Sequence, residues 1–106
     1  MTASLESVNE MIADPKVLER LCRTNDITTL RIFGSAARGE ASGESDIDLL
    51  AEFGRPVSLM DLVGIEQAFE EELGRKVDLL TPRALSPHIR DRVLSEAIVV
   101  YTRPGR

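Results

Sequence analysis

Asp46 and Asp48, two aspartates separated by one apolar residue, are the side chains of this sequence best placed by type and spacing to do chemistry. In an extended strand, positions i and i+2 point to the same face, so the two Cα atoms would lie about 6–7 Å apart. Carboxylate oxygens bind magnesium, which in turn binds the phosphates of a substrate. The alternative is that both aspartates are the solvated face of a half-buried strand, although aspartate is a poor strand former.

The dipeptide Gly34-Ser35 directly follows a predicted strand and is the second candidate for chemistry. Glycine permits close backbone approach to a phosphate, and the amides and hydroxyl of a following helix start can donate hydrogen bonds to it. The sequence contains neither GxxxxGK[ST] nor GxGxxG, so a phosphate chain would be held by a metal ion and this short turn. An ordinary strand-to-helix turn is the alternative.

A third carboxylate, Asp78, lies within the short apolar run 76–80 (KVDLL). An aspartate in the middle of such a strand is locally unfavourable, and conflicts of this kind concentrate at functional sites. If this strand lies beside the strand of Asp46 and Asp48, Asp78 can face the same metal ions and help to deprotonate an acceptor hydroxyl. The alternative is an edge-strand aspartate that points to water.

The elements that must position these residues follow from apolar spacing and from capping and breaking residues. The spacing predicts helices at 4–13, 15–25, 59–73 and from 87 onward, and strands at 28–33, 47–53, 76–80 and 98–101. Helix starts are marked by Asp14, by Ser58 with Asp61, and by Ser86, while Gly74 marks a helix end. We expect an α/β (α+β) fold, a small mixed β-sheet flanked by helices. The predicted core side of the helix at 59–73 consists of Leu59, Leu62, Val63, Ile65 and Phe69, and Met60 is also expected in the core.

Composition narrows the remaining possibilities. The chain of 106 residues is expected to form one domain, 1–106. A single cysteine excludes an intramolecular disulfide, no apolar run approaches the roughly 20 residues of a membrane span, and the N-terminus does not resemble a signal peptide. These features favour a cytoplasmic protein without a membrane partner. The net charge of −5 disfavours nucleic acid as a partner, because a negative surface repels a phosphate backbone.

The run 34–39 (GSAARG), followed by 45–50 (SDIDLL), resembles the signature of the DNA polymerase β-like nucleotidyltransferase superfamily. Within it, the chain is similar to the minimal nucleotidyltransferase (MNT) branch, for which Arg38-Gly39 after the Gly-Ser turn is typical. The resemblance covers residues 28–101 and implies the polymerase β-like fold. The chain would then comprise N-terminal helices at 1–25 and a catalytic core at 26–102.

The resemblance also implies a role for each matching residue. Gly34 and Ser35 would contact the triphosphate of ATP, and Arg38 would be a further phosphate contact unless it is a solvated helix charge. The catalytic carboxylates, which would hold Mg²⁺ in a two-metal site, would be Asp46, Asp48 and Asp78.

Many MNT proteins are encoded beside a HEPN protein, a helical RNase toxin, and act as its antitoxin, in some cases by adenylylating the toxin on tyrosine. The resemblance therefore implies transfer of AMP from ATP onto a HEPN partner. One alternative is an antitoxin that neutralises its toxin by binding alone. The other is an aminoglycoside-type enzyme, disfavoured because such enzymes usually carry an extra domain that 106 residues cannot supply.

Three other features are expected to have structural roles. His88 should be exposed at a helix start, and Cys22 should be part of the packing of a helix. The three consecutive glutamates at 70–72 should form the solvated face of a helix.

Overall fold

The computed structural model describes residues 14–34, 37 and 46–104. Its elements follow one another in the order α2 (Pro15–Thr24), β1 (Ile27–Phe33), β2 (Ile47–Phe53), α3 (Leu59–Leu73), β3 (Val77–Leu80), the 3-10 helix η1 (Pro82–Ala84), α4 (Pro87–Glu96) and β4 (Ile98–Thr102). The predicted helix at 4–13 lies outside the described residues. None of the helices described here is long and apolar enough to cross a membrane.

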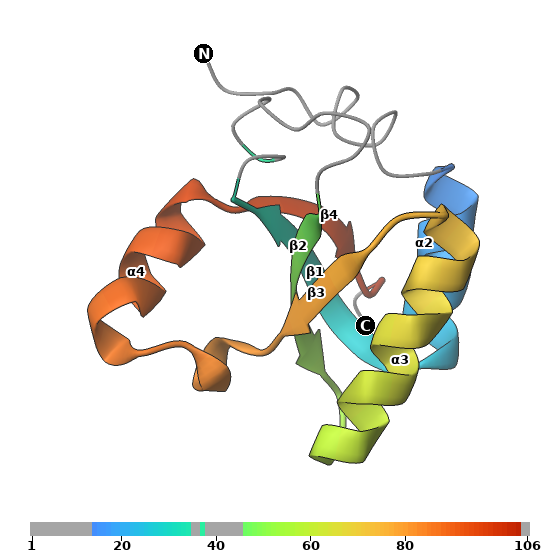
Figure 1. Cartoon of the computed structure of the whole chain (residues 1–106), viewed down its shortest axis with the longest axis horizontal. Helices are drawn as coiled ribbons and strands as arrows, with labels where there is room; N and C mark the ends of the chain where they lie inside the picture. Colours follow the sequence, from blue (N-terminus) through green and yellow to red (C-terminus); the bar gives the residue numbers. More distant parts are fainter. Residues whose placement is uncertain (1–13, 35–36, 38–45, 105–106) are drawn as a thin grey trace.

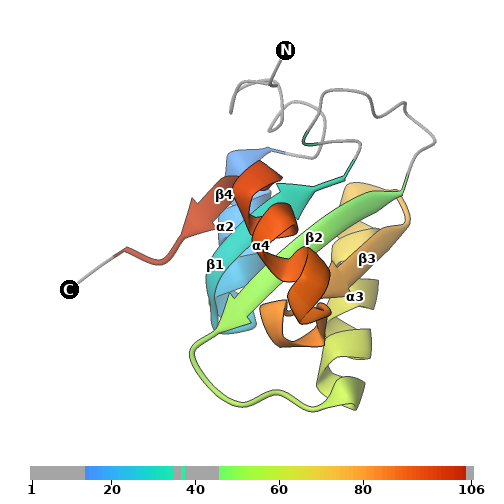
Figure 2. The same ribbon diagram turned by 90° about the vertical axis from the view of Figure 1, so that its left-hand side faces the viewer.

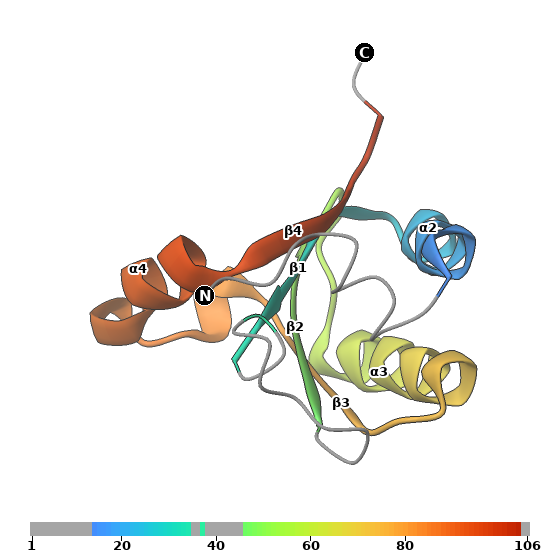
Figure 3. The same cartoon turned by 90° about the horizontal axis from the view of Figure 1, so that it is seen from above.

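The described strands form a mixed sheet in the order β3-β2-β1-β4. Strand β1 is antiparallel to both β2 and β4, whereas β2 and β3 are parallel. Helices α2 and α3 lie together on one side of the sheet and α4 lies on the other, as Figures 1 and 3 show from two directions. The predicted fold class, a small mixed sheet flanked by helices, is confirmed.

Side-chain caps fix where the helices begin. The Asp14 carboxylate accepts a hydrogen bond of 2.8 Å from the Lys16 N–H at the start of α2. At the start of α3, Ser58 and Asp61 each accept a hydrogen bond of 3.0 Å from the other's backbone N–H, which is a capping box. Gly74 ends α3 with a positive φ of 67°. These start and stop signals were predicted from the sequence and are confirmed.

The core lies between the sheet and the pair α2 and α3. Side chains alternate along β2, so Ile47, Leu49 and Ala51 are fully buried in this core. They pack with Leu18 of α2 and Phe69 of α3, both also buried. Full burial of a side chain of this size stabilises the fold by roughly 1.5–3 kcal/mol. The alternation therefore points the neighbouring residues of β2 to the opposite face of the sheet.

The predicted core side of α3 is correct for its second half and wrong for its beginning. Ile65 and Phe69 are buried, and Leu62 is partly buried. The side chains of the others are exposed, by 76% for Leu59, 78% for Met60 and 41% for Val63. Figure 1 shows the reason: the first turns of α3, in yellow-green, project past the end of the sheet, so the sheet does not cover them.

Candidate active site

The two aspartates predicted to hold a metal ion lie at the start of β2. Asp46 immediately precedes the strand and is exposed, whereas Asp48 is its second residue and is half-buried. Ile47 between them is fully buried in the core. Because side chains alternate along a strand, burial of Ile47 directs both carboxylates toward the face opposite α2 and α3.

Strand β3 brings the third aspartate to the same place. The parallel pairing of β2 and β3 makes Asp48 and Asp78 direct partners in the register. Neighbouring strands lie about 4.8 Å apart, and directly paired residues point to the same face. The condition set from the sequence, that the strand of Asp78 should lie beside the strand of Asp46 and Asp48, is therefore met. The Asp78 side chain is exposed.

Gly34 at the end of β1 completes this end of the sheet. The antiparallel register pairs Phe33 with Asp48, so Gly34 comes next to that aspartate. Gly34 has a positive φ of 73°, and a Cβ atom at this position would overlap Oδ2 of Asp48. Both observations require glycine, the first because L side chains rarely adopt this backbone conformation and the second because of space. The Asp48 carboxylate thus lies directly against the backbone of Gly34.

The end of β1 and the starts of β2 and β3 therefore meet at one end of the sheet, at the upper right of Figure 2. Carboxylate oxygens are ligands suited to magnesium, and a cation would offset the repulsion between neighbouring carboxylates. In the part of the chain that the structure describes, no three His, Cys, Asp or Glu side chains are already grouped as a metal site. The carboxylate oxygens of the three aspartates suit magnesium, and the register of β2 and β3 holds Asp48 beside Asp78.

Ser35 and Arg38, the other two predicted nucleotide contacts, lie outside the described residues. Gly34 is the predicted nucleotide contact that the structure does describe, and its backbone faces the Asp48 carboxylate. The roles of Ser35 and Arg38 remain predictions.

Cys22 and His88 have the structural roles expected of them. Cys22 is fully buried, and burial raises the pKa of its thiol to about 12, so a thiolate nucleophile is not available at neutral pH. His88 is exposed in the first turn of α4, where its backbone N–H donates to the Ser86 hydroxyl at 3.2 Å.

Glu66 and Glu70 were not recognised as important from the sequence. Glu70, expected on a solvated face, accepts a hydrogen bond from the Val77 N–H at 3.0 Å. Glu66 accepts one from the Leu79 N–H at 2.8 Å. The available signal was their i, i+4 spacing on the side of α3 that also carries the buried Ile65 and Phe69.

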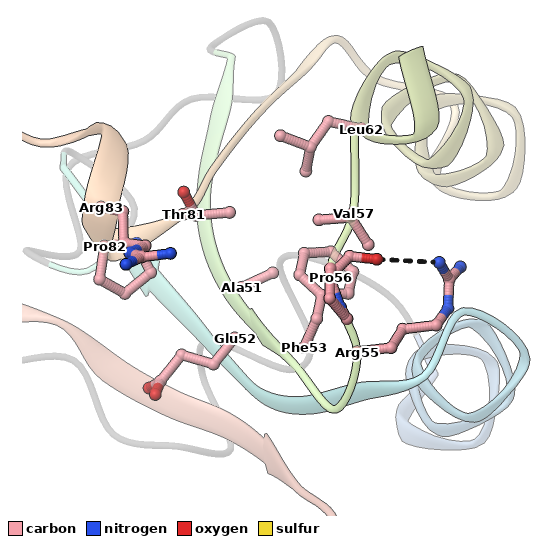
Figure 4. Close-up of a pocket in the computed structure, with 10 residues that line it drawn as sticks. All are labelled: Ala51, Glu52, Phe53, Arg55, Pro56, Val57, Leu62, Thr81, Pro82 and Arg83. Atoms are coloured by element: carbon pink, nitrogen blue, oxygen red, sulfur yellow. Dashed lines mark hydrogen bonds between the residues drawn. The ribbon is translucent and has the colours of Figure 1, made fainter. Parts of the chain in front are cut away.

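A separate pocket of about 540 Å³ lies at the other end of β2. Figure 4 shows its lining, in which apolar side chains such as Phe53, Val57 and Leu62 are joined by Arg55 and Arg83. The guanidinium of Arg55 donates to the Pro56 carbonyl at 3.3 Å. None of the three aspartates lines this pocket.

Comparison with known proteins agrees with the geometry. Residues 15–100 match the family described as the nucleotidyltransferase domain. A relative from Methanocaldococcus jannaschii, provisionally named protein adenylyltransferase MJ0435, is 51% identical over 69 residues, which are 65% of this chain and 74% of the relative. Protein adenylyltransferase MntA from Thermococcus cleftensis is 32% identical over 97 residues, which are 92% of this chain and 96% of the relative.

Two solved structures share the fold. A structure provisionally described as a minimal nucleotidyltransferase has a TM-score of 0.72 at 38% identity and covers 91% of this chain and 95% of its own. An MNT antitoxin in complex with a tri-AMPylated HEPN toxin, from Shewanella oneidensis, gives a TM-score of 0.64 at 20% identity and covers 83% of this chain and 69% of the matched chain. The chain therefore belongs to the nucleotidyltransferase domain family, as a minimal nucleotidyltransferase related to MntA-type protein adenylyltransferases.

Proposed function

We propose that this nucleotidyltransferase, acting as one domain over residues 1–106, transfers AMP from ATP onto a HEPN toxin with magnesium as cofactor and so serves as its antitoxin. The observation that carries the proposal is the register of β2 and β3, which pairs Asp48 with Asp78 next to Gly34. Relatives named protein adenylyltransferase support the transferred group. The matched complex of an MNT antitoxin with an AMPylated HEPN toxin supports the acceptor.

Each residue of the site has a definite task in this proposal. Asp46 and Asp48 hold magnesium, which when bound offsets the negative charge of the triphosphate. The backbone at Gly34 admits a phosphate closely because no Cβ intervenes. Ser35 and Arg38 add a hydroxyl and a guanidinium to the phosphate contacts.

Asp78 receives the proton of the acceptor in this scheme. The acceptor hydroxyl of the partner attacks the α-phosphorus of ATP, and a new P–O bond forms to the partner. The bond from the α-phosphorus to the oxygen that bridges to the β-phosphate breaks, and pyrophosphate leaves. The hydroxyl proton passes to the Asp78 carboxylate, whose exposed side chain can meet a hydroxyl presented by another protein.

The test is to incubate the purified chain with ATP, magnesium and the protein encoded next to it, and to measure the intact mass of both. We expect AMP-sized increments on the neighbouring protein, and no increments with Asp48→Asn or without magnesium. If wild type shows binding of magnesium and ATP but adds no AMP, the transfer proposal is wrong.

Growth of cells that express the toxin separates transfer from simple masking. If transfer neutralises the toxin, Asp48→Asn should fail to restore growth even though it still binds the toxin in a pull-down. Restoration of growth by Asp48→Asn would instead identify an antitoxin that acts by binding alone.

A further inference from the structure

Among the strands that the structure describes, β3 is at the edge of the sheet, and side chains of α3 cover its outer side. Strand β3 is the edge strand next to β2, and Asp78 lies in it between Val77 and Leu79. Residues 77 and 79 differ by two positions, so their N–H groups point to the same side, away from β2. An edge strand normally leaves such groups to water or to another chain.

Two carboxylates of α3 accept these two N–H groups. The Val77 N–H donates to Oε2 of Glu70 at 3.0 Å, and the Leu79 N–H donates to Oε2 of Glu66 at 2.8 Å. Both hydrogen bonds are partly shielded from solvent. A charged acceptor makes each of them stronger than a bond between two neutral groups.

The spacing of the two acceptors matches the spacing of the two donors. Glu66 and Glu70 are four residues apart on one helix face, which is about 6 Å along the axis. Alternate residues of a strand are about 6.6 Å apart. The pairs run in opposite order, Glu70 with Val77 and Glu66 with Leu79, so α3 lies antiparallel to β3 as a two-point brace along its edge.

The two hydrogen bonds of this brace lie on either side of Asp78 along β3. The Leu79 N–H belongs to the peptide plane that follows Asp78, and the Val77 N–H belongs to the plane that precedes Val77, so α3 holds the β3 backbone on both sides of Asp78. On the inner side, the parallel register with β2 holds Asp78 beside Asp48. Movement of β3 by even 1 Å would change the distance between these two carboxylates, and misplacement on this scale can cost about 100-fold in rate.

We propose that Glu66 and Glu70 are positioning residues for the transfer reaction, acting through the β3 backbone to hold Asp78 beside Asp48. This inference rests on the role proposed above for Asp78 in transfer. The two glutamates are engaged by the backbone at the edge of the strand and act without touching nucleotide or acceptor.

The experiment compares alanine and glutamine variants at both positions. Glu66→Ala with Glu70→Ala removes both acceptors, and we expect kcat to fall by about 10–100-fold while KM for ATP changes by less than about twofold. Glu66→Gln with Glu70→Gln keeps an amide oxygen that can accept, so kcat should stay within about threefold of wild type. Glu71→Ala, at an exposed position of the same helix, is the matched control and should leave kcat unchanged.

Amide hydrogen exchange supplies a readout that is independent of activity. The Val77 and Leu79 amides should exchange about tenfold faster or more in the double alanine variant, and near the wild-type rate in the glutamine variant. If the double alanine variant does not fold, the single variants take its place. Glu66→Ala should then speed exchange of the Leu79 amide, and Glu70→Ala should speed exchange of the Val77 amide. Faster exchange with unchanged kcat, or unchanged exchange, would overturn the inference.

Failure of the proposed function gives a different result. Wild type would then transfer no AMP, and the positioning inference would be tested by adding Mn²⁺ alone and recording the NMR signal of the Asp78 amide. Broadening of the Asp78 amide signal by Mn²⁺ should be present in wild type and the glutamine variant and weakened in the double alanine variant. Equal broadening in all of them, or none in wild type, would count against the brace as a device that positions Asp78.

Discussion

The two ends of β2 differ in chemistry. At its start, Asp46 and Asp48 lie beside Asp78 of β3 and Gly34 of β1. At its end, the chain forms the pocket of about 540 Å³ shown in Figure 4. None of the three aspartates lines this pocket.

Two ion pairs lie at the pocket end of β2. Glu52 at the end of β2 forms an ion pair with Arg31 of β1, and Arg55 lies near Asp61 at 3.9 Å. Basic and acidic side chains thus accompany each other in this region, whereas the start of β2 and β3 brings carboxylates together. A cavity shows where something could fit, but carboxylates that face each other on paired strands show where a cation would be stabilised.

The largest expected effect is at the start of β2. Asp48→Asn should lower transfer by roughly 10²–10³-fold or more, because the neutral amide is a poorer ligand for a hard cation. The melting temperature measured without magnesium should not fall, since the change removes like-charge repulsion with Asp78. Asp46→Asn should behave in the same way. A clear loss of stability in both variants without magnesium would argue against a metal site at this end.

Replacement of Gly34 tests the contact between β1 and β2. Gly34→Ala should destabilise the fold by about 1–2 kcal/mol, because its φ of 73° is unfavourable for an L side chain. Its Cβ would also displace the Asp48 carboxylate, so transfer should fall by about 10–100-fold. Urea unfolding and steady-state kinetics measure the two effects.

Gly64→Ala is the matched control for the change at Gly34. Gly64 lies within α3, and a Cβ there would meet open space. The substitution should raise stability by about 0.5–1 kcal/mol, since alanine favours a helix, and should leave transfer unchanged. Equal losses of transfer in the two alanine variants would show that the contact with Asp48 is not the cause.

The capping box at the pocket end should affect stability without affecting chemistry. Ser58→Ala removes the cap of α3 and should cost about 1 kcal/mol in urea unfolding, with kcat unchanged. Two hydrogen bonds lower the pKa of Asp61. The larger effect comes from the bond with the Ser58 backbone and the smaller from the bond with the Ser58 side chain. Because the folded pKa is the lower one, the Asp61 carboxylate stabilises the fold above its unfolded pKa near 4, and this contribution is lost as pH falls through the folded pKa.

That pH dependence can be measured directly. Stability of wild type and of Asp61→Asn should converge as the solution is acidified below about pH 4. A constant difference between the two proteins from pH 7 to pH 3 would contradict this account of the cap.

The smallest expected effect is in the pocket itself. Arg83→Ala removes a side chain from its lining and should change kcat/KM for transfer by less than about twofold, because no predicted site residue lies there. Steady-state kinetics with the same acceptor measures this. A loss of tenfold or more would contradict the separation of the two ends of β2, since the pocket end would then take part in recognising a substrate.

Much of the fold could be predicted because its signals are local. Asp14 before Pro15, and Ser58 with Asp61, act within a few residues, so their pattern in the sequence already defines the helix start. Strand β2 was predicted over its full length for a similar reason, since its apolar residues form an uninterrupted pattern up to Phe53. The exposed start of α3 could not be predicted, because apolar spacing does not reveal where the sheet beneath a helix ends.

The candidate site divides in the same way. The aspartate pair, the Gly-Ser turn and the presence of a later strand aspartate were evident from residue type and spacing alone. The neighbours of Asp78 could not be predicted from the sequence, because strand order depends on contacts between segments about 30 residues apart. The roles of Glu66 and Glu70 were hidden for the same reason: the N–H groups they accept belong to a different element.

Residue type and spacing alone identified the residues that we propose bind a magnesium–nucleotide complex, and predicted the local elements that carry them. The parallel arrangement of β3 and β2, the pairing of Asp78 with Asp48, and the contact of the Asp48 carboxylate with Gly34 became evident in the folded chain alone. The physical reason is that capping and side-chain alternation act within a few residues of the chain, whereas register results from burying one face of the sheet against α2 and α3.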